Sequence, residues 1–175
     1  KQQQYKPQHV GQEVVCIWAG TSGRLDRLPL GKGRGYLEGV LAYIEGQPIG
    51  WCAVAPRETY PALDRSRILQ RVDDRPVWSV SCLFVARPHR RKGVSVRLLQ
   101  AAVEHVGDSG GHTLEGYPVE PRQDAMPDAF AWTGLASAFR QAGFKECLRR
   151  SETRPIMRFE IRPGSARPNA RPSRP

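Results

Sequence analysis

Apolar and polar residues alternate in blocks along this chain, and each block predicts an element of secondary structure. Residues 40–56, VLAYIEGQPIGWCAVAP, hold two apolar runs around a Glu-Gly-Gln-Pro turn, which is the pattern of a β-hairpin. Residues 77–85, VWSVSCLFV, are rich in β-branched and aromatic side chains, as a buried strand is. The polar stretch from Pro56 to Pro76 contains three prolines, so we expect a connection there, with at most one short helix.

A four-residue repeat of apolar side chains follows and predicts an amphipathic helix that ends near Gly107. The repeat consists of Val94, Leu98, Ala102 and Val106. Residues 112–119, HTLEGYPV, are a further strand candidate. A strand, a helix and a strand over residues 77–119 make a right-handed crossover, which places the two strands parallel.

The C-terminal part predicts one more helix and two closing strands. Residues 127–144, PDAFAWTGLASAFRQAGF, suggest a helix with Gly143 as its C-terminal cap. Residues 145–161, KECLRRSETRPIMRFEI, indicate two short strands around a turn. The elements from residue 40 onward therefore follow the order strand, strand, connection, strand, helix, strand, helix, strand, strand.

The two ends of the chain lack such patterning. Within residues 1–38 only EVVCIWAG has the composition of a strand, so this N-terminal segment is poorly defined. Residues 162–175, RPGSARPNARPSRP, place arginines among prolines and small residues, a composition that cannot bury a core and predicts a disordered tail. Residues 39–161 are left as the folded core of a 175-residue chain that we interpret as one domain.

Charge and cysteine usage narrow the class of protein. Lys and Arg total 27 against 17 Asp and Glu, a net charge of +10 that favours nucleic acid, anionic membranes or phosphorylated ligands as partners. No stretch approaches 18 apolar residues, which argues against a membrane span. The four cysteines and four histidines are isolated from one another, so the sequence predicts no disulfide and no metal site. We expect a reduced, cytoplasmic protein.

The densest basic cluster stands where a strand passes into a helix. RPHRRKGVSVRLL, residues 87–99, brings Arg90, Arg91 and Lys92 to the start of the predicted helix, with a glycine next to them. The first amides of a helix have no partner inside it and carry partial positive charge, which makes this place an anion site. An ordinary helix start on a basic surface would have the same spacing.

Here the sequence resembles the GNAT family of acyl-CoA-dependent N-acyltransferases. The acyl-CoA motif of that family is Arg or Gln, two residues, Gly, one residue, and a small residue, at the start of a helix that follows a strand. It stands here as RRKGVS, residues 90–95, five residues after the strand end at Val85. EGQPIGW and FRQAGF are similar to the hairpin and the fourth helix of the family, and the resemblance covers about residues 38–160. GWCAVAPRETYP, EGYPV and MPDAFAWTG are similar to a poorly characterised bacterial subgroup, which indicates no acceptor.

The resemblance implies an α/β (α+β) fold with a mixed central sheet, a splayed parallel strand pair and helices on both faces. It implies that the N-terminal segment would hold a first strand and two helices, which residues 1–38 do not clearly show. It also implies acetyl-CoA as co-substrate, no metal, and direct transfer of the acetyl group to an amine of unknown identity. The cofactor-binding residues that it implies are Leu83, Phe84, Val85, Arg90, Arg91, Lys92, Gly93, Val94, Ser95 and Phe139. Dimers are frequent among relatives, which leaves a homodimer open.

The catalytic groups are less well marked. Glu115 is the first candidate for the base that deprotonates the amine, and Glu58 is the second. Many relatives have a Tyr that protonates the leaving thiolate four residues before the Gly-Phe pair, but this chain has Phe139 there. Tyr117, Ser137 or water could take that role, or the thiolate could leave unassisted. Tyr117 and Trp132 are also candidates for lining the acceptor pocket.

Two alternatives stand beside an active acetyltransferase. A GNAT-fold protein that binds acyl-CoA without efficient turnover is consistent with Phe139 and with the unusual N-terminal segment. A nucleic-acid-binding protein could use RPHRRK and the basic tail, and it would bind with a steep salt dependence. The sequence shows no set of stacking aromatics, no helix-turn-helix spacing and no zinc knuckle, which disfavours nucleic acid.

Overall fold

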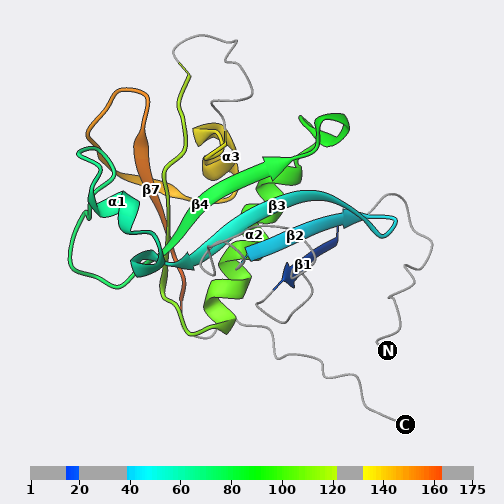
Figure 1. Ribbon diagram of the computed structural model, residues 1–175, viewed down its shortest axis with the longest axis horizontal. Coiled ribbons are helices and arrows are strands. Elements are labelled where there is room, and N and C mark those ends of the chain that lie inside the picture. The colour runs from blue at the N-terminus through cyan, green and yellow to red at the C-terminus, as the bar shows by residue number, and fades with distance from the viewer. Residues whose placement is uncertain (1–14, 20–38, 122–131, 163–175) are drawn as a thin grey trace.

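The structure is a computed structural model that describes residues 15–19, 39–121 and 132–162. Within these residues the chain forms a seven-stranded mixed sheet in the order β1-β2-β3-β4-β5-β7-β6 (Figure 1). The strands are β1 (Val15–Ala19), β2 (Gly39–Ile44), β3 (Gln47–Pro56), β4 (Trp78–Val85), β5 (Thr113–Gly116), β6 (Lys145–Arg149) and β7 (Pro155–Glu160). Every neighbouring pair is antiparallel except β4 and β5, which are parallel.

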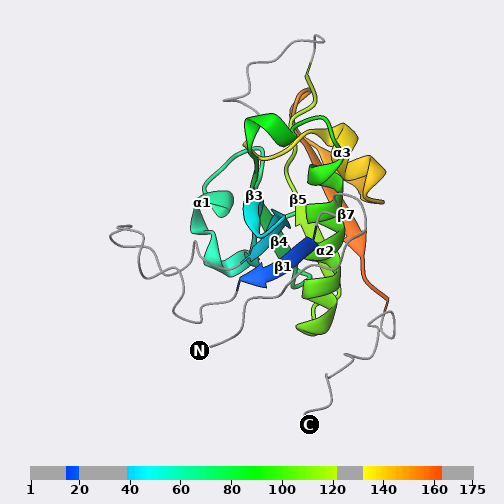
Figure 2. The same cartoon turned by 90° about the vertical axis from the view of Figure 1, so that its right-hand side faces the viewer.

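The helical segments lie between the strands in the predicted order. The β3–β4 connection contains the 3-10 turn η2 (Arg57–Thr59) and the helix α1 (Pro61–Asp64). The 3-10 turn η3 (Arg87–His89) and the helix α2 (Val94–Asp108) link β4 to β5, and α3 (Ala136–Gln141) precedes β6. Figure 2 shows α1 on one side of the sheet and α2 with α3 on the other, so helices cover both faces. No helix of the described residues is long and apolar enough to cross a membrane.

The hairpin at residues 40–56 is formed by β2 and β3. Glu45 and Gly46 make the turn, both with positive φ, at 50° and 76°. Two left-handed residues in a two-residue loop match the right-handed twist of the paired strands, which explains the strength of this sequence signal.

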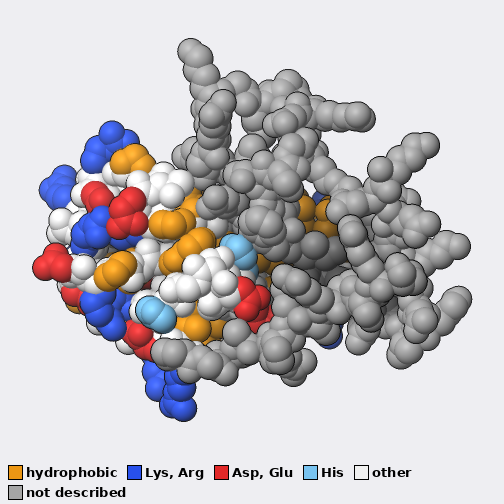
Figure 3. All heavy atoms as spheres, turned by 90° about the horizontal axis from the view of Figure 1, so that it is seen from below, with side chains coloured by type: hydrophobic (Ala, Val, Ile, Leu, Met, Phe, Trp, Pro, Cys, Tyr) orange, Lys and Arg blue, Asp and Glu red, His pale blue; other side chains and the backbone are white. Residues whose placement is uncertain are grey.

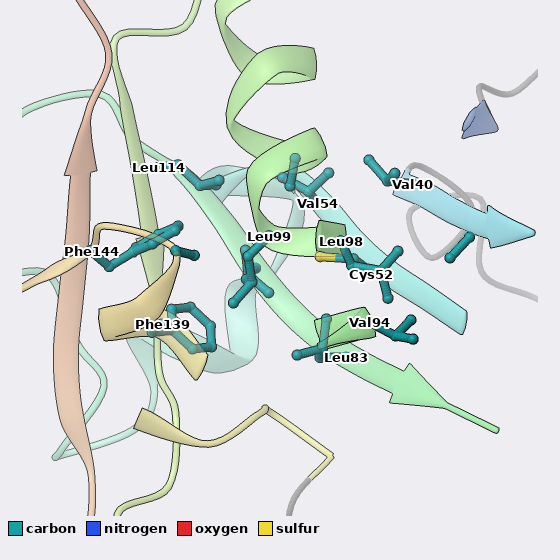
Figure 4. Close-up of a cluster of buried hydrophobic side chains, with 14 of the residues drawn as sticks. Val40, Cys52, Val54, Leu83, Val94, Leu98, Leu99, Leu114, Phe139 and Phe144 are labelled. Atoms are coloured by element: carbon teal, nitrogen blue, oxygen red, sulfur yellow. The ribbon is translucent and has the colours of Figure 1, made fainter. Parts of the chain in front are cut away.

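The main core lies between α2 and the sheet. The apolar repeat of α2 is buried, and Leu98 and Leu99 pack toward Cys52 and Leu83 of the strands (Figure 4). Phe139 and Phe144 extend this core under α3, with their rings 5.0 Å apart in an edge-to-face arrangement. The apolar face of α2 that the sequence predicts is therefore the face that packs against β2–β5.

Two predicted bounds differ from the structure. The strand expected at residues 112–119 pairs as a strand only over Thr113–Gly116. The helix expected within residues 127–144 begins at Ala136, and Gly134 before it has a φ of 84° that no α-helix allows. Residues 122–131 lie outside the described residues, as do the tail at 163–175 and most of the N-terminal segment. EVVCIWAG does supply a strand, β1, which pairs with β2.

Candidate active site

The loop between β4 and α2 ends in an open helix terminus. Gly93 caps α2 in the left-handed conformation, with φ 76° and ψ 2°, and Arg91 has a positive φ of 59°. The first helical hydrogen bond runs from the Arg97 N–H to the Gly93 carbonyl at 3.2 Å. The N–H groups of residues 94–96 therefore have no acceptor inside the helix. A Cβ on Gly93 would meet no atom of the described chain within 4 Å, so the terminus offers an anion both donors and room.

The three cations around this terminus have two different environments. Arg91 and Lys92 are exposed. Arg90 is half-buried, and its Nε donates to the Val85 carbonyl at 2.9 Å, at the end of β4. Arg90 therefore ties the loop to the strand, whereas Arg91 and Lys92 are free to swing toward an anion.

The parallel strands β4 and β5 separate beyond their first half. They pair only from Trp78 with Leu114 to Val80 with Gly116. Strand β4 continues to Val85 beside β3, but β5 ends at Gly116. The second half of β4 therefore has one edge that β5 does not occupy, as the predicted splayed pair requires.

A short non-helical segment, residues 132–135, lies between the separated strands. The Leu83 N–H donates to the Trp132 carbonyl at 2.7 Å, on the β4 side. On the β5 side, the Val119 N–H donates to the Gly134 carbonyl and the Ala136 N–H donates to the Val119 carbonyl, each at 2.9 Å. The N–H of Leu83, one of the cofactor-binding residues that the resemblance implies, thus already has a backbone acceptor.

Phe139 packs as a core residue at the base of this segment. It is fully buried, and a Cβ added to Gly116 would lie 2.1 Å from its Cε1 atom. A Cβ added to Gly134 would lie 2.9 Å from its Cε2 atom. The ring therefore lies against two glycines, one at the end of β5 and one in the segment 132–135.

Glu115 and Tyr117 belong to a buried polar cluster on the α1 side of the sheet. The Tyr117 hydroxyl donates to Glu115 Oε1 at 2.7 Å and lies 2.8 Å from the Ser79 hydroxyl. Arg57 Nη1 donates to the same carboxylate oxygen at 3.0 Å and to the Tyr117 hydroxyl at 2.6 Å. Burial, with a further contribution from the charge of Glu115, raises the pKa of Tyr117 well above its usual value.

A second arginine completes the cluster. Arg158 of β7 donates from Nε to Glu115 Oε2 at 2.7 Å and from Nη1 to Asp73 at 2.6 Å. The hydrogen bond from Arg158 holds the pKa of Asp73 well below its usual value. Both oxygens of Glu115 therefore accept from guanidinium groups.

Arg57, Arg158 and Asp73 were not among the residues singled out from the sequence. Arg158 did carry a signal, because it interrupts the apolar strand PIMRFE, and a charge in a central strand requires a partner. Arg57 and Asp73 lie in the polar connection, where a charged side chain is ordinary. Their role depends on contacts 58 and 85 residues away in the chain.

The remaining candidates lie outside this cluster. The Glu58 side chain is exposed and pairs with Arg71 at 3.2 Å. Trp132 is 56% exposed, next to the Leu83 contact, and Ser137 is exposed at the start of α3. The structure brings Glu115 and Tyr117 together but leaves Glu58 at the surface.

Charges on the described surface are mixed in sign. On the face in Figure 3, basic side chains lie among acidic ones rather than in one continuous stripe. The described residues contain no group of three or more His, Cys, Asp or Glu side chains that could hold a metal ion. RPHRRK is thus a local basic rim at one helix terminus.

A mixed sheet with a splayed parallel pair, followed by an open helix terminus, is the arrangement that the GNAT resemblance implied. The model of the acetyltransferase (GNAT) family matches residues 18–129, which is 112 of the 175 residues. This chain belongs to that family.

Several solved structures are similar to this chain. The aminoglycoside acetyltransferase AAC(6')-Ib, in complex with coenzyme A and kanamycin, is 17% identical, with a TM-score of 0.50 over 70% of this chain and 66% of that chain. A GNAT-family structure from Desulfovibrio desulfuricans is 19% identical, with a TM-score of 0.48 over 73% of this chain and 70% of that chain. The ribosomal-protein-alanine N-acetyltransferase of Brucella melitensis is 19% identical, with a TM-score of 0.45 over 71% and 68%.

Curated relatives match only locally. The ATP synthase subunit alpha of Streptomyces lividans is 38% identical over 50 residues, which is 29% of this chain and 10% of that protein. The chain spans about a tenth of the length of this relative, and so short a match indicates no shared activity.

Proposed function

We propose that this protein transfers an acetyl group from acetyl-CoA directly to an amine. The observation that carries the proposal is the open terminus of α2, capped by Gly93 with φ 76°, directly after a strand that has parted from its parallel neighbour. The first feature suits a pyrophosphate, and the second suits the amide-containing arm that follows it.

The residues of the RRKGVS motif divide the task of holding the phosphates. The N–H groups of Val94 and Ser95 donate to the pyrophosphate, and Arg91 with Lys92 neutralises its charge. Arg90 keeps the loop in place through its bond to the Val85 carbonyl. The Val94 side chain is buried in the core, which fixes the direction of the free amides.

The free edge of β4 then pairs with the arm of acetyl-CoA in the manner of an added strand. Leu83 directs its N–H away from β3, toward Trp132. Val85 directs its N–H to the same edge, because alternate residues of a strand share a side. When Trp132 releases the Leu83 N–H, that group can donate to the thioester carbonyl and to the oxyanion that forms during attack.

The reaction needs no covalent intermediate on the protein. The amine nitrogen attacks the thioester carbon, the C–N bond forms, the C–S bond breaks, and the acetyl group passes to nitrogen. The amine loses one proton and the thiolate of coenzyme A takes one, so the step is balanced without a further reactant.

Within this proposal Glu115 and Tyr117 are positioning residues. Their cluster ties β5 to β7 and to the β3–β4 connection, through Arg158 and Arg57. Direct proton transfer by either residue stays a prediction from the sequence. Both oxygens of Glu115 already accept from guanidinium groups inside a buried cluster, and that geometry favours the positioning role.

The test is binding of acetyl-CoA, measured by calorimetry and by thermal shift, followed by thiol release with a panel of amines. Gly93→Glu places a carboxylate at the phosphate seat and should weaken binding at least 100-fold. Gly110→Glu is the matched control, since Gly110 has a φ of 79° and open space around it at the other end of α2. If wild-type protein at millimolar acetyl-CoA gives neither heat nor a thermal shift, the proposal is wrong.

A second function is favoured by one contact. The 2.7 Å bond between the Leu83 N–H and the Trp132 carbonyl occupies the donor that catalysis would use. A protein that binds acyl-CoA without turnover would retain this bond. Binding of acetyl-CoA together with no thiol release above the spontaneous rate, across the whole amine panel, would favour that function.

A further inference from the structure

Arg154 stands in the turn between β6 and β7 and has an unusual set of partners. Its Nη1 donates to the Thr133 hydroxyl at 2.9 Å and to the Tyr117 carbonyl at 3.4 Å. Both acceptors are neutral. Its Nε and Nη2 donate no bond to the described residues and are not among the buried, unpartnered side-chain atoms. Those two donors therefore remain available to a ligand.

Three of the arginines that are withdrawn from solvent have carboxylate partners, whereas Arg90 and Arg150 donate to backbone carbonyls. Arg57 pairs with Glu115 and Asp64, and Arg158 pairs with Glu115 and Asp73. Arg149 follows the same rule with Glu120 and Glu146.

Arg154 is half-buried, yet it lies within 4 Å of no carboxylate in the described part of the chain. Burial lowers the pKa of Arg154, and no acidic group raises it. A partly desolvated guanidinium held in a fixed orientation, without a counter-ion, is suited to bind an anion.

The position of Arg154 connects it to the expected reaction centre. Thr133 accepts its hydrogen bond, and the preceding residue, Trp132, accepts from the Leu83 N–H at 2.7 Å. These two bonds and one peptide unit place the guanidinium within roughly 12 Å of that N–H, because adjacent Cα atoms are about 3.8 Å apart. The other contact, Tyr117, directly follows the end of β5. Arg154 therefore lies close to the place where β4 and β5 separate, in contact with Tyr117 after β5 and with Thr133 of the segment 132–135.

We propose that Arg154 binds a carboxylate of the acceptor, and that the acceptor is therefore an amine that also carries a carboxylate close to its amino group, as an amino acid does. This inference rests on the proposed acetyl transfer. The carboxylate takes the Nε and Nη2 donors of Arg154, and the amino group then faces the thioester carbon. The reaction yields an N-acetylated acid and coenzyme A, with the same balance of atoms and protons as above.

The test compares amines in matched pairs that differ only in the carboxylate. Glycine with glycinamide, and β-alanine with β-alaninamide, are assayed for thiol release, and kcat/KM is corrected for the fraction of free amine. For the wild-type protein we expect kcat/KM to be about 10- to 100-fold higher for the acid than for the amide, as a charged hydrogen bond implies. Arg154→Gln should bring each pair within about threefold while the Kd of acetyl-CoA is unchanged. Arg154→Lys should retain part of the preference, because it keeps the charge but loses the planar pair of donors.

Arg150→Gln is the matched control. Arg150 is also half-buried and donates only to backbone carbonyls, those of Gln70 and Arg71, away from Thr133. The Arg150→Gln variant should keep the full preference for the acids over the amides.

Equal kcat/KM for acid and amide in the wild-type protein would overturn the inference and leave acetyl transfer intact. A preference that persists in Arg154→Gln would also overturn it. If the Gln variant does not fold, an undiminished preference in Arg154→Lys would overturn the inference instead. Failure of the wild-type protein to bind acetyl-CoA would instead overturn the proposed function, and this inference with it.

Discussion

The Leu83 N–H and the Trp132 carbonyl form a 2.7 Å hydrogen bond across the gap between the two parted parallel strands. This bond places the segment 132–135 along the edge of β4 that an acyl-CoA arm would pair with. In the proposed function the segment and the cofactor therefore compete for one donor, and the segment must withdraw before the cofactor is fully seated.

The competition predicts that loosening the segment strengthens acetyl-CoA binding. Gly134 has a φ of 84°, and an added Cβ would lie 2.9 Å from Leu83 Cδ2 and from Phe139 Cε2. Gly134→Ala should therefore destabilise the free protein by about 1–3 kcal/mol, from backbone strain and crowding. At the same time it should lower the Kd of acetyl-CoA several-fold in calorimetry.

The control for this prediction is Gly143→Ala. Gly143 has a φ of 97°, and its added Cβ would lie 2.9 Å from Phe159, at the far end of α3. Gly143→Ala should lower the stability of the free protein by a comparable amount but should not lower the Kd of acetyl-CoA. Weaker acetyl-CoA binding in Gly134→Ala would show that the segment belongs to the binding site and does not oppose it.

Neutralising Glu115 should destabilise the protein strongly. Glu115→Gln leaves the guanidinium groups of Arg57 and Arg158 without their shared charge, and breaking a buried pair costs about 3–5 kcal/mol. That loss corresponds to a fall in Tm of about 6–20 °C for a domain of this size. Glu58→Gln, at an exposed ion pair with Arg71, should stay within about 0.5 kcal/mol of wild type in denaturant unfolding.

The pH–rate profile separates the two roles of Glu115. A catalytic base predicts that Glu115→Gln, assayed below its Tm, loses the acidic limb of the kcat/KM profile. A positioning residue predicts that the limb is retained while kcat falls. We expect the limb to be retained, because both carboxylate oxygens accept from arginines.

Asp73 should make the fold sensitive to acid. The Arg158 hydrogen bond depresses the pKa of Asp73 in the folded state, so its stabilising contribution is present above the unfolded pKa and is lost as pH falls toward the folded value. Asp73→Asn should lower Tm at pH 7, and its difference from wild type should shrink below about pH 4. Asp74→Asn, at an aspartate without an ion pair among the described residues, should show no such narrowing. A constant difference across this range would contradict the assignment.

The sequence predicted the order of elements because hydrophobic period and turn chemistry are local. The α2 repeat and the Glu45–Gly46 turn both carry their signal within a few residues. Residues 132–135 illustrate the limit. Their composition suits a helix, but hydrogen bonds to Leu83 and Val119, far away in the chain, hold them in a non-helical conformation. Long-range pairing of this kind has no local pattern, and the same is true of the contact between Arg57 and Glu115.

Substitutions at Gly116 and Phe139 should have strongly coupled effects on stability. A Cβ on Gly116 would lie 2.1 Å from Phe139 Cε1, closer than any relaxed contact, so Gly116→Ala must displace the ring or the strand. We expect a loss of about 3 kcal/mol, as for an overpacked core. Phe139→Leu leaves space and should restore a large part of that loss in the double variant, which gives a coupling energy of about 1–3 kcal/mol.

Gly107→Ala, whose Cβ would lie 3.3 Å from Ile161, should be nearly neutral in the same unfolding measurements, because a gain in helix propensity offsets the crowding. Additive effects of Gly116→Ala and Phe139→Leu would mean that the ring does not lie against β5, and Phe139 would then be free to face the acyl-CoA arm.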